Sequence, residues 1–123
     1  IQSKLNNDYN TGLKIDGVFG KLTKAALVKA LQIELNKQYK AGLKVDGVFG
    51  SKTKAKCITL RRGAKGNITW ILQAILYCLG YDPKGLDGVF GSNTEKAVKQ
   101  FQKDKKITVD GIVGKVTWEK LFS

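Results

Sequence analysis

The sequence contains no histidine and only two cysteines, Cys57 and Cys78. The absence of histidine excludes His-based metal sites, Ser-His-Asp triads and Cys-His dyads together. Both cysteines fall at apolar positions of expected helices, so we interpret them first as small core residues and only second as a disulfide pair. No hydrophobic run approaches the length needed to span a bilayer, and we expect no signal peptide within the chain.

Acidic residues are also scarce, with ten Asp and Glu against 22 Lys and Arg among 123 residues, which gives a net charge of +12. Such a charge favours polyanionic surroundings, namely nucleic acid, an anionic membrane or an anionic cell wall. The lysines are spread over the whole chain, without a dense cluster or a motif that reads nucleic acid. We therefore expect only weak, salt-sensitive affinity for nucleic acid and no specific binding to it.

One five-residue stretch, Asp-Gly-Val-Phe-Gly, occurs three times, and a softer copy, Asp-Gly-Ile-Val-Gly, occurs once. The copies lie at Asp16–Gly20, Asp46–Gly50, Asp87–Gly91 and Asp110–Gly114, and a threonine follows each Asp by seven positions. Asp-Gly is a strong turn signal, because Gly adopts positive φ without steric cost and Asp accepts a hydrogen bond from a nearby backbone N–H. The repeat therefore predicts a turn, an apolar pair that enters the core, and a helix after the second Gly.

The repeated Asp residues have an alternative interpretation as catalytic or metal-binding groups. A calcium loop needs oxygen ligands at alternating positions, whereas the residues two before each Asp are Lys14, Lys44, Gly85 and Thr108. A glycosidase needs two carboxyl groups at a set separation across a cleft, and the pattern singles out no such pair. We therefore interpret these Asp residues as architectural and expect no catalysis, no metal site and no cofactor.

The repeat continues upstream of the turns, because Gln2, Gln32 and Gln73 each lie fourteen residues before an Asp. No segment shows the two-residue alternation of a half-buried strand, and apolar residues recur at helical spacing. Helices are expected at Ile1–Tyr9, at Lys21–Tyr39, at Ser51–Cys57, from Ile68 to a cap at Gly80, at Ser92–Lys105 and at Thr117–Phe122.

Each half of the chain thus reads helix, turn, helix, turn, helix. We predict an all-α fold of two three-helix modules in tandem, packed together, with Asp-Gly turns between the helices. The modules are predicted at residues 1–59 and 60–123, with Ile58–Ala64 as the linker.

Residues Leu60–Phe122 resemble the peptidoglycan-binding domain of type 1, a small three-helix cell-wall module. The resemblance rests on the Leu-Arg-x-Gly opening at Leu60, on Leu79-Gly80-Tyr81, on the two Asp-Gly turns with their threonines, and on Thr117-Trp118. Residues 1–59 resemble a second, divergent copy, mainly through their two turns.

This resemblance implies a non-catalytic module that binds peptidoglycan, through its glycan strand or its stem peptide. Such modules accompany an amidase, muramidase or peptidase domain in endolysins, autolysins and spore-cortex enzymes. We accordingly expect the chain to be cut from a longer protein, either a phage lysin or a secreted autolysin. We expect it to act at a bacterial, Gram-positive cell wall outside the cell, and not at a membrane.

Aromatic side chains are the first candidates for ligand contact, because glycan sites commonly place an aromatic face beside a few polar groups. Trp70, Tyr77 and Tyr81 form one stripe along a helix and its exit. That helix is apolar nearly all round, so Trp70 and Tyr77 have an alternative role in packing against residues 1–59. Trp118 is a further candidate, with a core position as its alternative.

Three polar residues complete the predicted ligand-binding set. Arg62 could hold a stem-peptide carboxylate or a wall phosphate, although a solvated linker position is an equal alternative. Asn67 and Asn93 could offer amide groups at a pocket, or cap helices. We expect binding to combine a shallow specific site with charge attraction to anionic wall polymers, the alternative being charge-driven binding to teichoic acid or nucleic acid alone.

Overall fold

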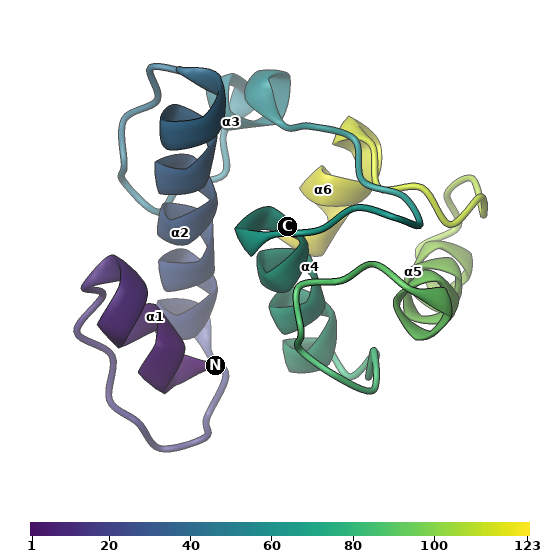
Figure 1. The fold of residues 1–123 in the computed structure, drawn as a ribbon, viewed down its shortest axis with the longest axis horizontal. Coiled ribbons are helices and arrows are strands. Elements are labelled where there is room, and N and C mark those ends of the chain that lie inside the picture. The colour runs from purple at the N-terminus through teal and green to yellow at the C-terminus, as the bar shows by residue number, and fades with distance from the viewer. The chain divides into compact units, whose positions relative to one another are not determined.

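The computed structural model describes residues 1–123 and contains six α-helices and no β-strand (Figure 1). The helices are α1 (Gln2–Tyr9), α2 (Lys21–Tyr39), α3 (Ser51–Lys56), α4 (Asn67–Cys78), α5 (Ser92–Asp104) and α6 (Lys115–Leu121). The all-α prediction is confirmed. None of the six helices combines the length and the apolar character that crossing a bilayer requires.

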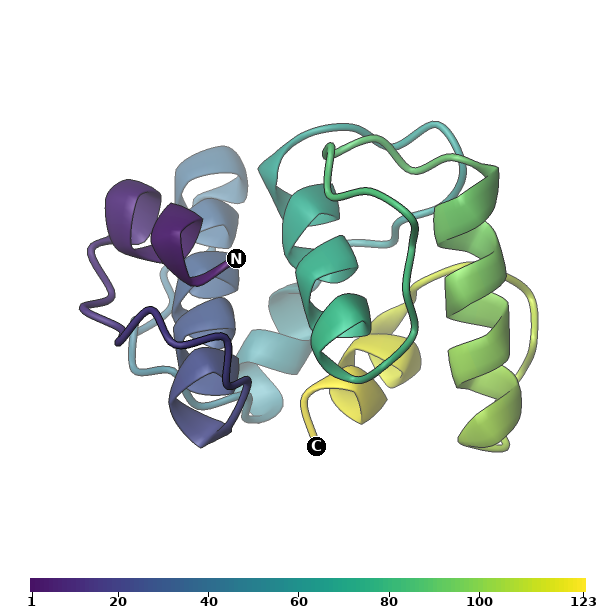
Figure 2. The same ribbon diagram turned by 90° about the horizontal axis from the view of Figure 1, so that it is seen from below.

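The chain divides into two compact units, Ile1–Lys56 and Cys57–Ser123, and each is described by itself. In the first unit, α1 packs against the 19-residue helix α2, and α3 follows the second turn (Figure 2). Leucines of α1 and α2 are fully buried, namely Leu5, Leu27, Leu31 and Leu35. This apolar face of α2 has the helical spacing that the sequence indicates.

Both α1 and α2 end in the same way. Each is followed by a residue with positive φ, Asn10 or Lys40, whose N–H donates to a carbonyl four residues back. The side chain of Asn36 then pairs with both backbone polar groups of Leu43, at 2.8 Å from its Nδ2 to the carbonyl oxygen and 2.7 Å from its Oδ1 to the amide nitrogen. Asn6 does the same thirty residues earlier, so the two loops of the first unit are duplicates.

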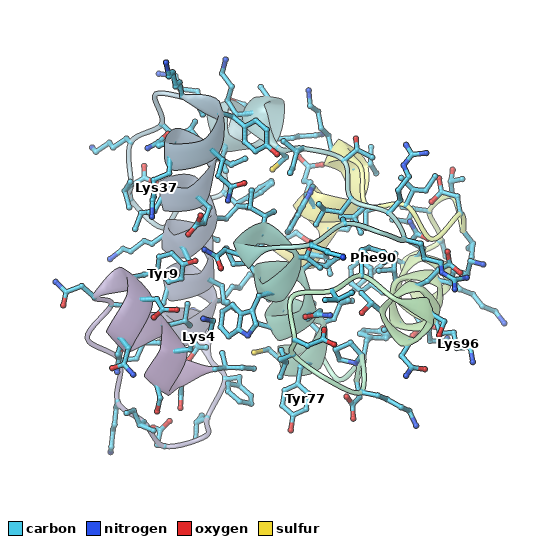
Figure 3. All side chains as sticks on the ribbon, viewed as in Figure 1. Lys4, Tyr9, Lys37, Tyr77, Phe90 and Lys96 are labelled. Carbon is cyan, nitrogen blue, oxygen red and sulfur yellow. The ribbon has the colours of Figure 1, made fainter.

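In the second unit, α4 packs against α5, and α6 completes the core. Every residue from Ile68 to Leu76 in α4 is buried. Phe101 from α5, Trp118 from α6 and Phe90 from the third turn are fully buried in this unit. Figure 3 shows Phe90 directed inward beside α4 and α5.

The segment before α4 is an ordered part of the second unit and not a linker as predicted. The amide of Leu60 donates to the carbonyl of Val113, and the amide of Val113 donates back to Leu60, at 3.0 and 2.8 Å between N and O. The amide of Phe90 donates to the carbonyl of Ala64. The indole of Trp118 also donates to the carbonyl of Ile58, at 2.9 Å. These bonds attach the segment to the third and fourth turns and to α6.

The apolar pair of each turn does not enter the core as a pair. Phe90 is 1% exposed, whereas Phe19 is 37% exposed, and Val18 and Val89 face solvent. The extended backbone after the Asp-Gly turn points successive side chains to opposite sides, so only one member of a pair can be buried. The prediction of two inward residues is therefore wrong for Val18, Val48 and Val89, and in the first turn it is wrong for Phe19 as well.

Candidate functional site

Each repeated turn is held by the side-chain amide of a buried glutamine. In the third turn, Nε2 of Gln73 lies 3.1 Å from Oδ1 of Asp87, 3.0 Å from the carbonyl oxygen of Val89 and 3.1 Å from Oγ1 of Thr94. Its Oε1 accepts the amide of Gly88 at 2.9 Å. We call the Gln, the Asp and the Thr of each turn a glutamine clamp.

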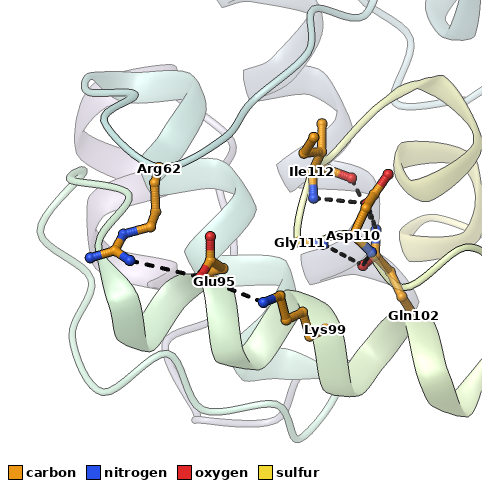
Figure 4. Close-up of polar contacts among 7 residues, drawn as sticks. All are labelled: Arg62, Glu95, Lys99, Gln102, Asp110, Gly111 and Ile112. Atoms are coloured by element: carbon orange, nitrogen blue, oxygen red, sulfur yellow. Dashed lines mark hydrogen bonds and ion pairs between the residues drawn. The ribbon is translucent and has the colours of Figure 1, made fainter.

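The same clamp occurs at all four turns. The other three consist of Gln2, Asp16 and Thr23, of Gln32, Asp46 and Thr53, and of Gln102, Asp110 and Thr117. Figure 4 shows the amide of Gln102 against the fourth turn. The clamp explains why a threonine follows each Asp by seven positions, because its hydroxyl completes the surroundings of the buried amide.

The Asp carboxylates of the clamps are structural acceptors. Oδ1 of Asp87 accepts the amide of Val89 at 3.0 Å, besides the amide of Gln73. These hydrogen bonds, the backbone one first, lower the pKa of Asp87, and the equivalent bonds lower the pKa of Asp16 and of Asp46. The arrangement supports the architectural interpretation of the repeated Asp residues.

Acid should therefore weaken the clamps. Because the folded pKa lies below the unfolded value of about 3.9, the stabilisation is fully present above that value and is lost as the pH falls through the folded pKa. We expect carboxyl-carbon NMR titrations of Asp16, Asp46 and Asp87 to show midpoints below about 3.9. Midpoints at or above the ordinary value would contradict the hydrogen-bonding pattern.

A groove of about 270 Å³ lies beside Tyr81, between the exit of α4 and the face of α5. The ring of Tyr81 packs edge-on against Phe101, with centroids 5.4 Å apart, and its hydroxyl donates to Oδ2 of Asp104 at 2.8 Å. This hydrogen bond is the main reason that the pKa of Tyr81 is raised. Besides Tyr81, the groove is lined by Gly80 and Ala97 and by five polar or charged residues, Asp82, Lys84, Asn93, Lys96 and Gln100.

The structure thus brings together two residues of the predicted ligand-binding set, Tyr81 and Asn93. Tyr77 is exposed, and Figure 3 shows its ring directed outward. Trp70 is 6% exposed, and its predicted packing against residues 1–59 stays a prediction. Trp118 is fully buried and stacks on Phe122, with ring centroids 6.1 Å apart, so it serves the core and offers no surface to a ligand.

The predicted polar contacts lie on the surface of the second unit. A guanidinium nitrogen of Arg62 lies 3.9 Å from Oε1 of Glu95 (Figure 4). Asn67 and Asn93 are both exposed, and neither caps a helix, because Gly66 and Gly91 occupy the N-cap positions of α4 and α5. Asn93 instead lines the groove beside Tyr81.

Three further grooves repeat beside the first, second and fourth turns, with volumes of about 390, 390 and 590 Å³. Each is lined by the three residues of the local clamp and by two lysines. We call them the turn grooves, and their lysines are Lys14 and Lys21, Lys44 and Lys52, and Lys106 and Lys115. Sequence analysis missed these grooves, although the lysine two before the Asp recurs in the first two repeats.

Comparison with known proteins identifies relatives for both units. A family model described as "Putative peptidoglycan binding domain" matches residues 1–56 and 66–121. The chain is 32% identical over 121 residues, 98% of its length, to the uncharacterized protein FadG of Bacillus subtilis, and covers 21% of that protein. It is 39% identical over 62 residues, half of its length, to the spore cortex-lytic enzyme of Oceanobacillus iheyensis, and covers 22% of that enzyme.

A solved structure, the N-terminal domain of SleB, covers 52% of this chain and 88% of its own length, with 36% identity and a TM-score of 0.51. The chain spans about a fifth of the length of the two curated relatives. Both halves of the chain match one family model, and that match covers most of the residues. The chain therefore belongs to the peptidoglycan-binding domain family, as a tandem pair of all-α modules.

Proposed function

We propose that the chain is a non-catalytic module that binds peptidoglycan and brings an attached peptidoglycan hydrolase to a Gram-positive cell wall. The observation that carries the proposal is that both halves match a family of peptidoglycan-binding domains. A relative named as a spore cortex-lytic enzyme supports the link to wall hydrolysis. The hydrolase would be an amidase, muramidase or peptidase domain of the same parent protein, acting at the wall outside the cell.

The groove beside Tyr81 is the proposed contact for the glycan strand. It combines an aromatic ring with the amides of Asn93 and Gln100, which is the composition expected of a site that orients a sugar. Phe101 and Asp104 fix the ring of Tyr81, so little side-chain entropy would be lost on binding. Asn67, Trp70, Tyr77 and Arg62 remain proposed contacts of the same unit.

Replacing Tyr81 with alanine is expected to weaken binding to purified peptidoglycan about tenfold, which corresponds to about 1.4 kcal/mol. The matched control is Tyr81→Phe, which keeps the ring and removes only the hydrogen bond to Asp104. We expect the phenylalanine variant to bind within about twofold of the original chain, as measured by co-sedimentation. Equal losses in both variants would show that the hydroxyl and not the ring makes the contact.

A second candidate function follows from the net charge of +12. Teichoic acid or nucleic acid would then be bound through charge alone, with affinity that falls steeply as salt rises. Co-sedimentation with sacculi that carry or lack teichoic acid, at low and high salt, separates the two functions. Binding to stripped sacculi that survives high salt supports peptidoglycan recognition, whereas binding that requires teichoic acid and disappears in salt overturns it.

A further inference from the structure

We propose that the three turn grooves bind the free carboxylates of peptidoglycan stem peptides. This inference rests on the proposed function and adds to it the chemical group that is recognised. It starts from the repetition of one chemistry in three places: each groove presents two ammonium groups, one carboxylate and an apolar wall.

The lysines of the turn grooves are free to bind an anion. All six are exposed, and none forms a salt bridge within the protein. The only acidic residue in each groove is the clamp Asp, whose Oδ1 already accepts two hydrogen bonds, as for Asp16 from Val18 and Gln2. Two ammonium groups against one carboxylate leave each groove with a net positive charge, which complements an anionic ligand.

The remaining groups of the grooves fit a peptide rather than a sugar. None of the three grooves is lined by an aromatic residue, so none offers a ring for a sugar to stack on. Their apolar walls suit the methyl groups of alanine residues. These walls consist of Leu13, Val18 and Leu22, of Leu43 and Val48, and of Ile107, Ile112 and Val116.

The clamp Asp distinguishes a peptide from a phosphate polymer. Oδ2 of Asp16, Asp46 and Asp110 accepts no hydrogen bond from the protein and can accept one from a peptide N–H. A teichoic acid chain has no N–H groups along its phosphates, and the same carboxylate would repel them. Carboxylate, N–H and methyl groups occur together at the ends of stem peptides, which therefore match all three features.

The third turn serves as an internal contrast. Gly85 and Ser92 stand there at the positions that Lys14 and Lys21 occupy in the first turn. The groove next to that turn also holds two lysines, Lys84 and Lys96, but it adds Tyr81 and the amides that we assign to the glycan, and it lacks the clamp residues. The two kinds of groove thus provide separate contacts for the two components of peptidoglycan, and several weak contacts on one polymer reinforce each other.

The test uses the full chain with one lysine replaced in each turn groove, Lys14→Ala, Lys44→Ala and Lys115→Ala together. The matched control replaces three exposed lysines outside the grooves, Lys37→Ala, Lys103→Ala and Lys120→Ala, and removes the same charge. Dissociation constants are measured by co-sedimentation with teichoic-acid-free sacculi. The sacculi are used either native or with their stem-peptide carboxylates converted to amides.

We expect the groove variant to bind native sacculi about tenfold more weakly and the control variant within about twofold, because exposed ion pairs are weak singly but add over three sites. Amidation of the sacculi should weaken binding of the original chain about as much as the three groove substitutions do. It should weaken binding of the groove variant little further. Equal losses of binding in both variants, or undiminished binding of the original chain to amidated sacculi, would overturn the inference about the turn grooves. Either result would leave the proposed function standing. Failure of the original chain to bind any sacculus would overturn the proposed function instead.

Discussion

Replacing Gln73 with leucine is expected to lower the free energy of unfolding of the second unit by about 3–5 kcal/mol. Leucine has a similar size but leaves the carbonyl of Val89, the amide of Gly88 and the hydroxyl of Thr94 without their partner. Each buried polar group left unsatisfied costs about 1–3 kcal/mol. Because whole domains are stable by only about 5–15 kcal/mol, the loss of one clamp removes a large part of the stability.

Urea unfolding followed by tryptophan fluorescence measures this loss, since Trp70 and Trp118 both lie in the second unit. The matched control is Gln100→Leu, because Gln100 is an exposed glutamine of α5 that bonds only to Asp104. We expect the control to change the free energy of unfolding by less than about 0.5 kcal/mol. A loss below about 1 kcal/mol for Gln73→Leu would show that the clamp does not hold the turn.

Replacing Trp118 with alanine has the second large expected effect, a loss of about 3–5 kcal/mol. Trp118 is fully buried, stacks on Phe122 and donates its indole N–H to the carbonyl of Ile58. The substitution would open a cavity in the core and release the segment before α4. Its consequence for wall binding would therefore come from unfolding and not from a lost contact with the ligand.

The variant Trp118→Phe separates the two parts of this effect. Phenylalanine keeps a ring stacked near Phe122 but leaves the carbonyl of Ile58 without its donor. We expect a loss of about 1–3 kcal/mol by chemical denaturation, with Trp70 as the fluorescent reporter. If the Trp118→Phe chain is folded with unchanged stability but loses wall binding, Trp118 contacts the ligand after all.

Local sequence signals predicted the helices and turns well, because each depends on neighbouring residues. The expected helix at Lys21–Tyr39 coincides with α2, and the other helix boundaries differ by two residues or less. The expected cap of α4 at Gly80 is confirmed, because Gly80 has positive φ and follows the end of the helix. The spacing of Gln73 to Asp87 pointed to a shared unit. This spacing did not reveal the clamp, because a sequence pattern does not show where a side chain points.

Sequence analysis missed residues whose contact partners do not lie at a constant distance along the chain. Gln102 lies eight residues before Asp110, and not fourteen, so the fourth clamp escaped the alignment of the repeats. The pairing of Leu60 with Val113 joins distant parts of the chain, and the sequence around Leu60 therefore looked like a linker. Burial of Trp118 likewise depends on the whole core, which a motif of neighbouring residues does not encode.

The same reasoning applies to the candidate site. Tyr81 and Asn93 were both candidates, but only the packing of α4 against α5 shows that they line one groove. The turn grooves could not be predicted, because their lysines are unremarkable in a chain with 22 basic residues. Their significance comes from the three-dimensional repetition of lysine pairs beside the clamps.

The central claim is that the chain recognises peptidoglycan itself and is not held at the wall by charge alone. The most direct test is the dissociation constant for sacculi stripped of teichoic acid, measured over a range of salt concentrations. We predict saturable binding that weakens with salt but persists at high salt. The contacts proposed at the Tyr81 groove do not depend on net charge, so salt does not screen them away. Binding that vanishes at high salt and returns only on walls bearing teichoic acid would contradict the account.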